Sequence, residues 1–499
     1  MTLIAPAGAL QAFLDTSLDE ALAGADDPAA GEAQALALFH SVARGVPAYA
    51  SFLREYGIDP ARVQTFADFE RLPLIDKRNY VSRYPLPERC HGGTLRGCDM
   101  VAVSSGSTGQ PTVWPRRVED ELPIARRFEQ VFFDSFRADS RSTLAVVCFA
   151  LGTWVGGMYT AQSCRYLAAR GYPLTNITPG NNKAEILRVV RELGSQFQQV
   201  VLLGYPPFLK DVIEAGVADG VDWSPLNLKL VMAGEVFSEE WRTLVGQRTG
   251  STEPCFDSAS LYGTADAGVL GNETPLSIGI RRYLADHPDA ARALFGESRL
   301  PTLVQYDPRV RFFEVHDGTL LFSGDNGVPL VRYHIADSGG LIGYQEMLAF
   351  VRQHGFDPIA EVSRASDRGV RPLPFAYVFG RADFTISYFG ANVYPENVTV
   401  GLEQSPIDQW VTGKFVMQAR EDEDRDRCLS VVVELGPGIA PSDDKVDVIA
   451  DSVLRHLLRL NSEFAHYVPP ERQRPRVELA PLGDPAYFPT GVKHRYTRR

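Results

Sequence analysis

The chain has 499 residues, with 50 Lys and Arg against 62 Asp and Glu, which gives a formal net charge of −12 at pH 7. This length corresponds to about three average domains, or to one large domain with a smaller one attached. The acidic balance argues against a nucleic-acid or anionic-membrane scaffold, because proteins that bind these negatively charged partners usually carry an excess of Lys and Arg. We therefore expect the partners to be small molecules.

The first hundred residues are predicted to be mostly helical and carry no recognisable targeting signal. No basic region precedes the first apolar residues, and Asp15 and Asp19 follow soon after, which argues against a secretory leader. The six cysteines are scattered, as expected of reduced thiols, so we predict a cytoplasmic protein. Cys90, His91 and Cys98 could begin a zinc site, but a second ligand pair at usable spacing is missing from the sequence.

A segment rich in Ser and Gly, residues 103–112, carries the strongest functional signal. Glycines allow a loop to approach phosphate oxygens closely, and hydroxyl and backbone N–H groups donate hydrogen bonds to them. The segment lacks the lysine of a Walker A loop, and a flexible linker is the alternative interpretation. Because it lies between a strand-like segment and Val113-Trp114, we predict a nucleotide phosphate loop. Its predicted ligands are Ser104, Ser105, Gly106, Ser107, Thr108 and Gly109.

The middle of the chain alternates between predicted strands and helices. Strands are predicted at residues 143–150, 199–203 and 228–232, and helices at 159–170, 183–193 and 238–250. Such alternation requires crossover connections, so we expect a largely parallel sheet that is covered on both faces by helices. The most apolar stretch, residues 144–158, is interrupted by glycines and is shorter than the ~20 residues that a bilayer requires.

After about residue 381 the pattern changes to that of a smaller α+β unit. We predict a helix from residue 395, a strand at 429–435, a helix at 446–460 and a strand near 477. The predicted division is therefore a large N-terminal domain, residues 1–381, and a small C-terminal domain, residues 382–499.

Five separated stretches, in their order along the chain, resemble the adenylate-forming enzymes of the acyl-CoA synthetase (ANL) superfamily, specifically the phenylacetate–CoA ligase-like branch. They are residues 103–112, 233–235 with 261–266, 329–337, 380–383 with 390–396, and 489–496. The resemblance spans nearly the whole chain and starts at residues 69–80. It implies an α/β fold of the ANL type, in which a large domain with mostly parallel sheets flanked by helices precedes a small, mobile α+β domain.

The resemblance implies that the second stretch holds ATP. Backbone around Gly234 and Glu235 would line the adenine, and the ring of Tyr262, next to Gly263, would stack on it. By itself, a Tyr-Gly pair after a strand is more typical of a tight turn.

Two residues at the end of the same stretch are implied to be catalytic. Thr264 would reach a phosphate group. Asp266 stands where family members usually have a Glu that helps to hold Mg²⁺, and a hard cation with oxygen ligands still fits the shorter aspartate.

The third and fourth stretches would contact the ribose and form the hinge. Asp337 would accept hydrogen bonds from both ribose hydroxyls, although a lone Asp after an apolar strand is ordinarily a cap or turn residue. Arg381 would contact the ribose or phosphate region, and Asp383 would be the hinge of the small domain. We assign no role to His334, which stands where the family commonly has Arg.

Lys493, in the fifth stretch, is the implied catalytic lysine. Attack of a carboxylate on the α-phosphate needs a mobile cation that neutralises the developing charge, whereas an isolated basic terminus is usually a solvated tail. Gln110 departs from the family pattern, which commonly has Lys there.

Residues 152–158 resemble the lining of the acid pocket, where glycines leave room for a flat group, but packing between helix and sheet is an equal alternative. The predicted pocket residues are Trp154, Gly156, Gly157 and Tyr205.

Together these features predict an AMP-forming ligase. It would activate a carboxylic acid, aryl or arylacetic, with ATP and Mg²⁺ as acyl-AMP, release pyrophosphate, and transfer the acyl group to CoA. An amine acceptor stays open, as does a catalytically weak nucleotide-binding relative marked by Gln110, Ala265 and Asp266. A serine hydrolase is not supported, because the sequence lacks a G-x-S-x-G nucleophile elbow.

Overall fold

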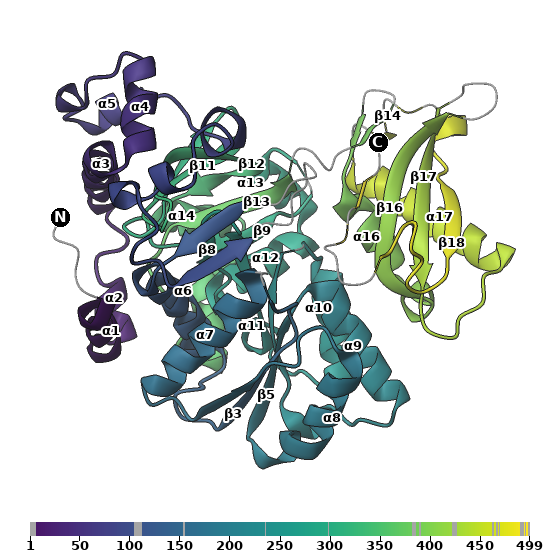
Figure 1. Cartoon of the computed structure of the whole chain (residues 1–499). Helices are drawn as coiled ribbons and strands as arrows, with labels where there is room; N and C mark the ends of the chain where they lie inside the picture. The colour runs from purple at the N-terminus through teal and green to yellow at the C-terminus, as the bar shows by residue number, and fades with distance from the viewer. Residues whose placement is uncertain are drawn as a thin grey trace.

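The computed structural model describes residues 6–497 with short gaps (Figure 1). The gaps are residues 104–111, 153–154, 235, 298, 382–385, 389–390, 422–426, 462–463, 466–467, 469, 490–493 and 495. None of the helices in the described residues is long and apolar enough to cross a membrane.

The chain begins with helices, as predicted. They are α1 (Pro6–Asp15), α2 (Leu18–Leu22), α3 (Pro28–Gly45), α4 (Pro47–Glu55) and α5 (Phe66–Phe69). The Asp27 side chain accepts a hydrogen bond from the Ala29 N–H, and Pro28 follows at the first helical position, so the start of α3 is fixed by its cap. A five-residue π-helical turn (Lys77–Val81) then leads to the antiparallel pair β1 (Met100–Val103) and β2 (Val113–Arg116).

The main sheet has eleven strands in the order β10-β11-β12-β13-β9-β8-β7-β6-β5-β3-β4. They are β3 (Thr143–Val147), β4 (Leu174–Ile177), β5 (Gln199–Gly204), β6 (Lys229–Ala233), β7 (Ser258–Thr264), β8 (Gly268–Asn272), β9 (Thr302–Gln305), β10 (Phe312–His316), β11 (Thr319–Gly324), β12 (Leu330–Ile342) and β13 (Phe375–Arg381). Only β4, β3, β5, β6 and β7 pair in parallel, and the remaining neighbours are antiparallel. The α/β class is confirmed, and the parallel part is the part that the strand–helix alternation predicted.

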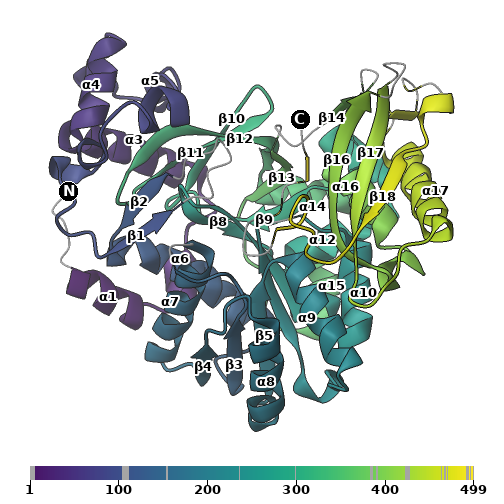
Figure 2. The ribbon, with the colours of Figure 1, turned by 45° about the vertical axis from the view of Figure 1, so that its right-hand side comes forward.

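Helices cover both faces of the parallel part (Figures 1 and 2). They are α6 (Val118–Gln130), α7 (Val155–Ala169), α8 (Lys183–Leu193), α9 (Pro206–Ala218), α10 (Glu239–Thr249) and the short α11 (Pro254–Asp257). The apolar face of α8, with Ile186, Val189 and Val190, packs on one side of the sheet against Val200 and Leu202 of β5. The predicted helix at residues 183–193 is confirmed, because its i, i+3, i+4 pattern is the face that the sheet buries.

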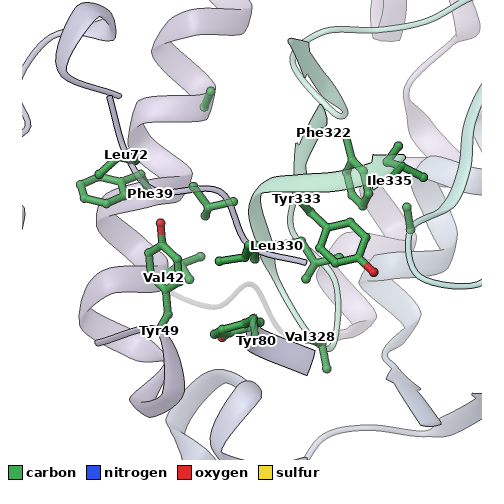
Figure 3. Packing of buried hydrophobic residues seen from close by; sticks show 14 of the residues in the cluster. Phe39, Val42, Tyr49, Leu72, Tyr80, Phe322, Val328, Leu330, Tyr333 and Ile335 are labelled. Atoms are coloured by element: carbon green, nitrogen blue, oxygen red, sulfur yellow. The ribbon is translucent and has the colours of Figure 1, made fainter. Parts of the chain in front are cut away.

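The antiparallel part packs against the N-terminal helices. Figure 3 shows the side chains of Phe39, Tyr49 and Tyr80 facing those of Leu330 and Tyr333 on β12. Further helices lie beside this part: α12 (Pro275–Asp286), α13 (Pro288–Phe295), α14 (Tyr344–Gln353) and α15 (Pro358–Ala365). The first hundred residues thus form one wall of a shared core, and they hold β12 in place from outside the sheet.

The residues from β14 onward form separate, smaller sheets at one side of the molecule (Figure 1). The elements are β14 (Ile386–Tyr388), β15 (Ala391–Val393), α16 (Pro395–Leu402), β16 (Val411–Glu421), β17 (Arg427–Leu435), α17 (Asp443–Leu460) and β18 (Arg476–Ala480). The predicted helices and strands correspond to α16, β17, α17 and β18, whereas β14, β15 and β16 were not predicted. The chain end adds to β16, because the Met417 N–H donates to the Tyr496 carbonyl at 2.6 Å.

Candidate active site

Two of the predicted nucleotide ligands meet although they come from distant strands. The Tyr262 hydroxyl, on β7, donates a hydrogen bond to Asp337 Oδ2, on β12, at 2.7 Å. Three strands, β8, β9 and β13, separate β7 from β12 in the sheet order. The sheet must therefore curl strongly, and its curvature brings the second and third predicted stretches together.

A β-bulge in β12 directs Asp337 towards this site. Leu321 of β11 pairs with His334, but Thr319 pairs with Ser338, so β12 contains extra residues between these pairs. Ala336, which lies in the bulge, has φ +62°, a left-handed conformation that L-residues other than Gly, Asn and Asp rarely adopt. Bulges re-aim side chains beside functional sites. Here the bulge places a carboxylate that is only 5% exposed next to the Tyr262 hydroxyl.

The backbone of Arg381 lies beside Asp337 in the sheet. Arg381 is the last residue of β13, and its backbone lies directly opposite Asp337 in the β12–β13 pairing. The structure therefore brings together Tyr262, Asp337 and the backbone position of Arg381, and their roles stay predictions. His334, to which we assigned no role, contacts the Thr319 hydroxyl through Nε2 at 2.8 Å and supports the turn between β10 and β11.

Thr264 and Asp266 lie at the tight turn between β7 and β8. The Thr264 hydroxyl oxygen accepts a hydrogen bond from the Ala267 N–H at 3.1 Å, which closes the turn. The Asp266 carboxylate accepts a hydrogen bond from the Tyr333 hydroxyl at 2.6 Å and lies 3.7 Å from the Lys77 ammonium. Both contacts are made to Oδ2, and Asp266 is only 4% exposed.

Lys77 is a site residue that the sequence analysis missed. It starts the π-helical turn after Asp76, whose carboxylate accepts hydrogen bonds from the N–H groups of Arg78 and Asn79. Backbone hydrogen bonds join Ile75 to β12, with the Ile75 N–H donating to Arg332 O and the His334 N–H donating to Ile75 O. The segment at residues 69–80 was recognised as part of the resemblance, but nothing in it indicated that its lysine pairs with Asp266.

Glycines of the predicted acid pocket lie where helix α7 approaches the sheet. A Cβ atom at Gly157 would come within 2.4 Å of the Ala150 carbonyl oxygen, so this glycine serves close packing. A Cβ atom at Gly156 would meet only the Phe149 ring and the Tyr205 hydroxyl, at 3.6 Å or more. The Tyr205 ring in turn packs on Gly234, where a Cβ atom would lie 2.8 Å from the ring. Gly156, Tyr205 and Gly234 therefore share one corner of the site.

Several predicted residues lie outside the described residues. These are the loop ligands Ser104, Ser105, Gly106, Ser107, Thr108 and Gly109, and also Trp154, Glu235, Asp383 and Lys493. The described strands on either side of the loop pair with each other, Val103 opposite Val113. The roles of these residues stay predictions.

The small C-terminal part docks on helices α9 and α10 through buried polar contacts. The Lys210 ammonium donates to the Asp408 carbonyl at 3.1 Å, and Arg248 pairs with the Asp408 carboxylate at 2.8 Å. The Ser238 hydroxyl donates to the Glu403 carboxylate. Burial raises the pKa of Glu403 to about 8 and lowers the pKa of Lys210 to about 8. Docking therefore shields the ionisable side chains of Glu403 and Lys210 from solvent.

Comparison with known proteins identifies the fold. Neither a protein-family model nor a curated protein sequence matches the chain. A crystal structure of 2-hydroxyisobutyryl-CoA ligase in the postadenylation state, in complex with R3-HIB-AMP, matches with a TM-score of 0.67 and 14% identity, over 95% of this chain and 90% of that chain.

Two further structures of that ligase match less well. The thioesterification-state complex with 2-HIB-AMP and CoA has a TM-score of 0.53 at 15% identity, over 95% of this chain and 90% of that one. An open conformation with the same ligands also has a TM-score of 0.53, at 14% identity, over 94% and 90%. The arrangement of this chain is thus more similar to the postadenylation state. The chain has the fold of the adenylate-forming ligases.

Proposed function

We propose that the protein is an AMP-forming ligase that activates a carboxylic acid with ATP. The acid oxygen would attack the α-phosphorus, forming acyl-AMP and releasing pyrophosphate. A nucleophile, by resemblance the CoA thiol, would then attack the acyl carbon and release AMP. The acid is proposed to be aryl or arylacetic, because Gly156 lies beside the edge-to-face pair of Phe149 and Tyr205, an aromatic surface on which a flat ring could pack.

The observation that carries the proposal is the contact between Tyr262 and Asp337. An aromatic ring and a carboxylate, held together at one corner of a curled sheet, suit an adenosine group, because the ring can stack on the base and the carboxylate can accept ribose hydroxyl hydrogens. Arg381, opposite Asp337, is proposed to face the ribose or phosphate region. The likeness in fold to a ligase solved with an acyl-AMP supports the same assignment.

The remaining predicted residues receive their roles by resemblance. The loop at residues 104–109 would hold phosphate oxygens, with Thr264 beside it, and the backbone of Gly234 and Glu235 would line the adenine. Lys493 would neutralise charge on the reacting oxygens, and Asp383 would be the hinge between the proposed domains, residues 1–381 and 382–499.

The residues do not fit a magnesium site that the protein alone would build. Asp266 is engaged by Tyr333 and Lys77, and the described residues hold no group of three or more His, Cys, Asp and Glu side chains in ligand geometry. Magnesium in nucleotide sites is usually held by one or two carboxylates together with phosphate oxygens. We therefore derive no step through the metal, and the role of Asp266 as its ligand stays a prediction.

A catalytically weak nucleotide-binding protein is the second candidate. The pairing of Asp266 with Lys77 favours it, because a carboxylate that already carries an ammonium partner is a poorer metal ligand. An amine in place of CoA is a variant of the first candidate.

Acid-dependent exchange of labelled pyrophosphate into ATP tests the proposal. A panel of aryl, arylacetic and short aliphatic acids should give exchange with at least one aromatic acid. AMP release in the presence of CoA or an amine then identifies the acceptor. ATP binding without exchange for any acid would instead support the weak nucleotide-binding protein.

A further inference from the structure

Two buried arginines donate hydrogen bonds to the backbone of the turn that carries Thr264 and Asp266. Arg116, at the end of β2, donates from Nη2 to the carbonyls of Ala265 at 2.6 Å and Asp266 at 3.0 Å. Arg311 donates from Nη2 to the carbonyl of Ala267 at 3.2 Å. Three successive backbone carbonyls of the turn, those of Ala265, Asp266 and Ala267, therefore accept hydrogen bonds from guanidinium groups.

The two arginines have no directly paired carboxylate in the part of the chain that the structure describes, although acids further away act on them. Among the described residues, neither guanidinium has a carboxylate oxygen within 4.0 Å. The more distant acids that act on Arg311, Asp120 and Asp325, are each engaged by Arg117, and Asp325 also by His91. Arg116 is 0% exposed and Arg311 3% exposed. Burial lowers the pKa of Arg311 to about 10, which leaves it protonated at neutral pH.

Neighbouring glycines make room for this arrangement. A Cβ atom at Gly327 would lie 2.2 Å from the Pro115 carbonyl oxygen, and one at Gly324 would lie 3.0 Å from Arg311 Cδ. Arg116 also donates from Nε to the Tyr159 hydroxyl, and Arg311 donates to Asn326 Oδ1 at 2.8 Å. The surroundings therefore fix both guanidiniums behind the turn.

We propose that Arg116 and Arg311 are positioning residues that hold the turn at residues 264–267 and place positive charge behind the nucleotide phosphates. Burying a charge without a carboxylate partner is costly, whereas neutral donors could hold the carbonyls without that cost. A polyphosphate in front of the turn would supply the missing negative charge, and a field from buried groups is poorly screened by water. The pair would also offset the absence of a lysine at Gln110. This inference rests on the proposed function.

Calorimetric titration with ATP, AMP and adenosine tests it. Arg116→Gln and Arg311→Gln should each raise the Kd for ATP about tenfold, raise that for AMP less, and leave adenosine within about twofold, because the lost attraction scales with ligand charge. Arg116→Lys and Arg311→Lys, which keep the charge, should bind ATP within about threefold of the wild type.

Arg127→Gln is the matched control, because Arg127 is also buried, lacks a carboxylate within 4.0 Å among the described residues, and bonds only to Gln130 within its own helix. Unchanged ATP affinity in folded Gln variants would overturn the inference, as would equal losses for ATP and adenosine. If the Gln variants fail to fold, Lys variants with a loss of tenfold or more for ATP would overturn the role of charge. A wild-type protein that does not bind ATP would contradict the proposed function itself.

Discussion

The contact between Tyr262 and Asp337 is the smallest feature on which the proposed function rests. A charge-assisted hydrogen bond contributes more than a neutral one, and an acceptor that loses its charge weakens every donor aimed at it. Asp337 is also almost fully buried, so a substitution there changes contacts inside the site and leaves the molecular surface nearly unchanged.

Asp337→Asn should raise the Kd for both ATP and AMP about tenfold or more, since the proposed charged acceptor for the ribose is lost while the side-chain shape is kept. Isothermal titration calorimetry measures both constants. Asp307→Asn is the control, because Asp307 is equally buried but its carboxylate pairs with Arg309 away from Tyr262. Equal nucleotide affinities for wild type and Asp337→Asn would contradict the proposed role of Asp337 in binding the ribose.

Ala336 provides a test of backbone strain at the bulge. Its positive φ costs roughly 1–2 kcal/mol for an L-residue, and glycine does not bear that cost although it loses more entropy on folding. Ala336→Gly should therefore raise the free energy of unfolding by up to about 1 kcal/mol in urea titrations. Ala376→Gly, in the neighbouring strand β13, should lower the free energy of unfolding, because Ala376 is buried and does not have a positive φ. A loss of stability in both variants would show that the bulge is not strained.

At the scale of elements, the close approach of α7 to the sheet depends on Gly157. Gly157→Ala should lower the free energy of unfolding by about 1–3 kcal/mol, because the added Cβ would overlap the Ala150 carbonyl. Gly279→Ala, in the middle of α12, should instead be neutral or stabilising by about 0.5–1 kcal/mol, since a Cβ there meets only the Cys255 sulfur at 4.0 Å. Thermal unfolding of the two variants compares them directly, and equal shifts would contradict the packing role of Gly157.

The sequence predicts the regular elements well because their signals are local. Ser238 caps α10 and Gly250 ends it in a left-handed conformation, as the start and stop signals indicated. The antiparallel half of the sheet could not be derived, because its register depends on a bulge at residues 335–337 and on packing against the N-terminal helices. For the same reason Lys77 and the carbonyl contacts of Arg116 were missed: each joins segments more than 100 residues apart, and a single sequence carries no signal for such pairs.

At the scale of the whole molecule, Glu403 links domain docking to pH. Its pKa rises from 4.5 to about 8 on burial, so the docked form binds more protons than the undocked form between these values. The docked arrangement should therefore be favoured at low pH and lost as pH rises towards 8. The groups that face Glu403 are Ser238, Glu240, Lys210 and Arg281.

We expect the separation between fluorophores on the two parts, measured by energy transfer, to increase between pH 6 and pH 8 in the wild type. Glu403→Gln, which keeps the side chain neutral, should make the separation independent of pH over this range. Lys210 titrates in the opposite direction above about pH 8, because its docked pKa is lowered. The range below pH 8 therefore isolates Glu403. A pH response that survives in Glu403→Gln would assign it to another group.

The curl that joins β7 to β12 also has a consequence for synthesis on the ribosome. Tyr262 emerges 75 residues before Asp337, and three strands must assemble before their side chains can meet. One of these strands, β13, is made after both residues and ends at Arg381. A nascent chain should therefore be unable to form the proposed adenosine site until residue 381 has left the exit tunnel, however early its parallel strands have formed.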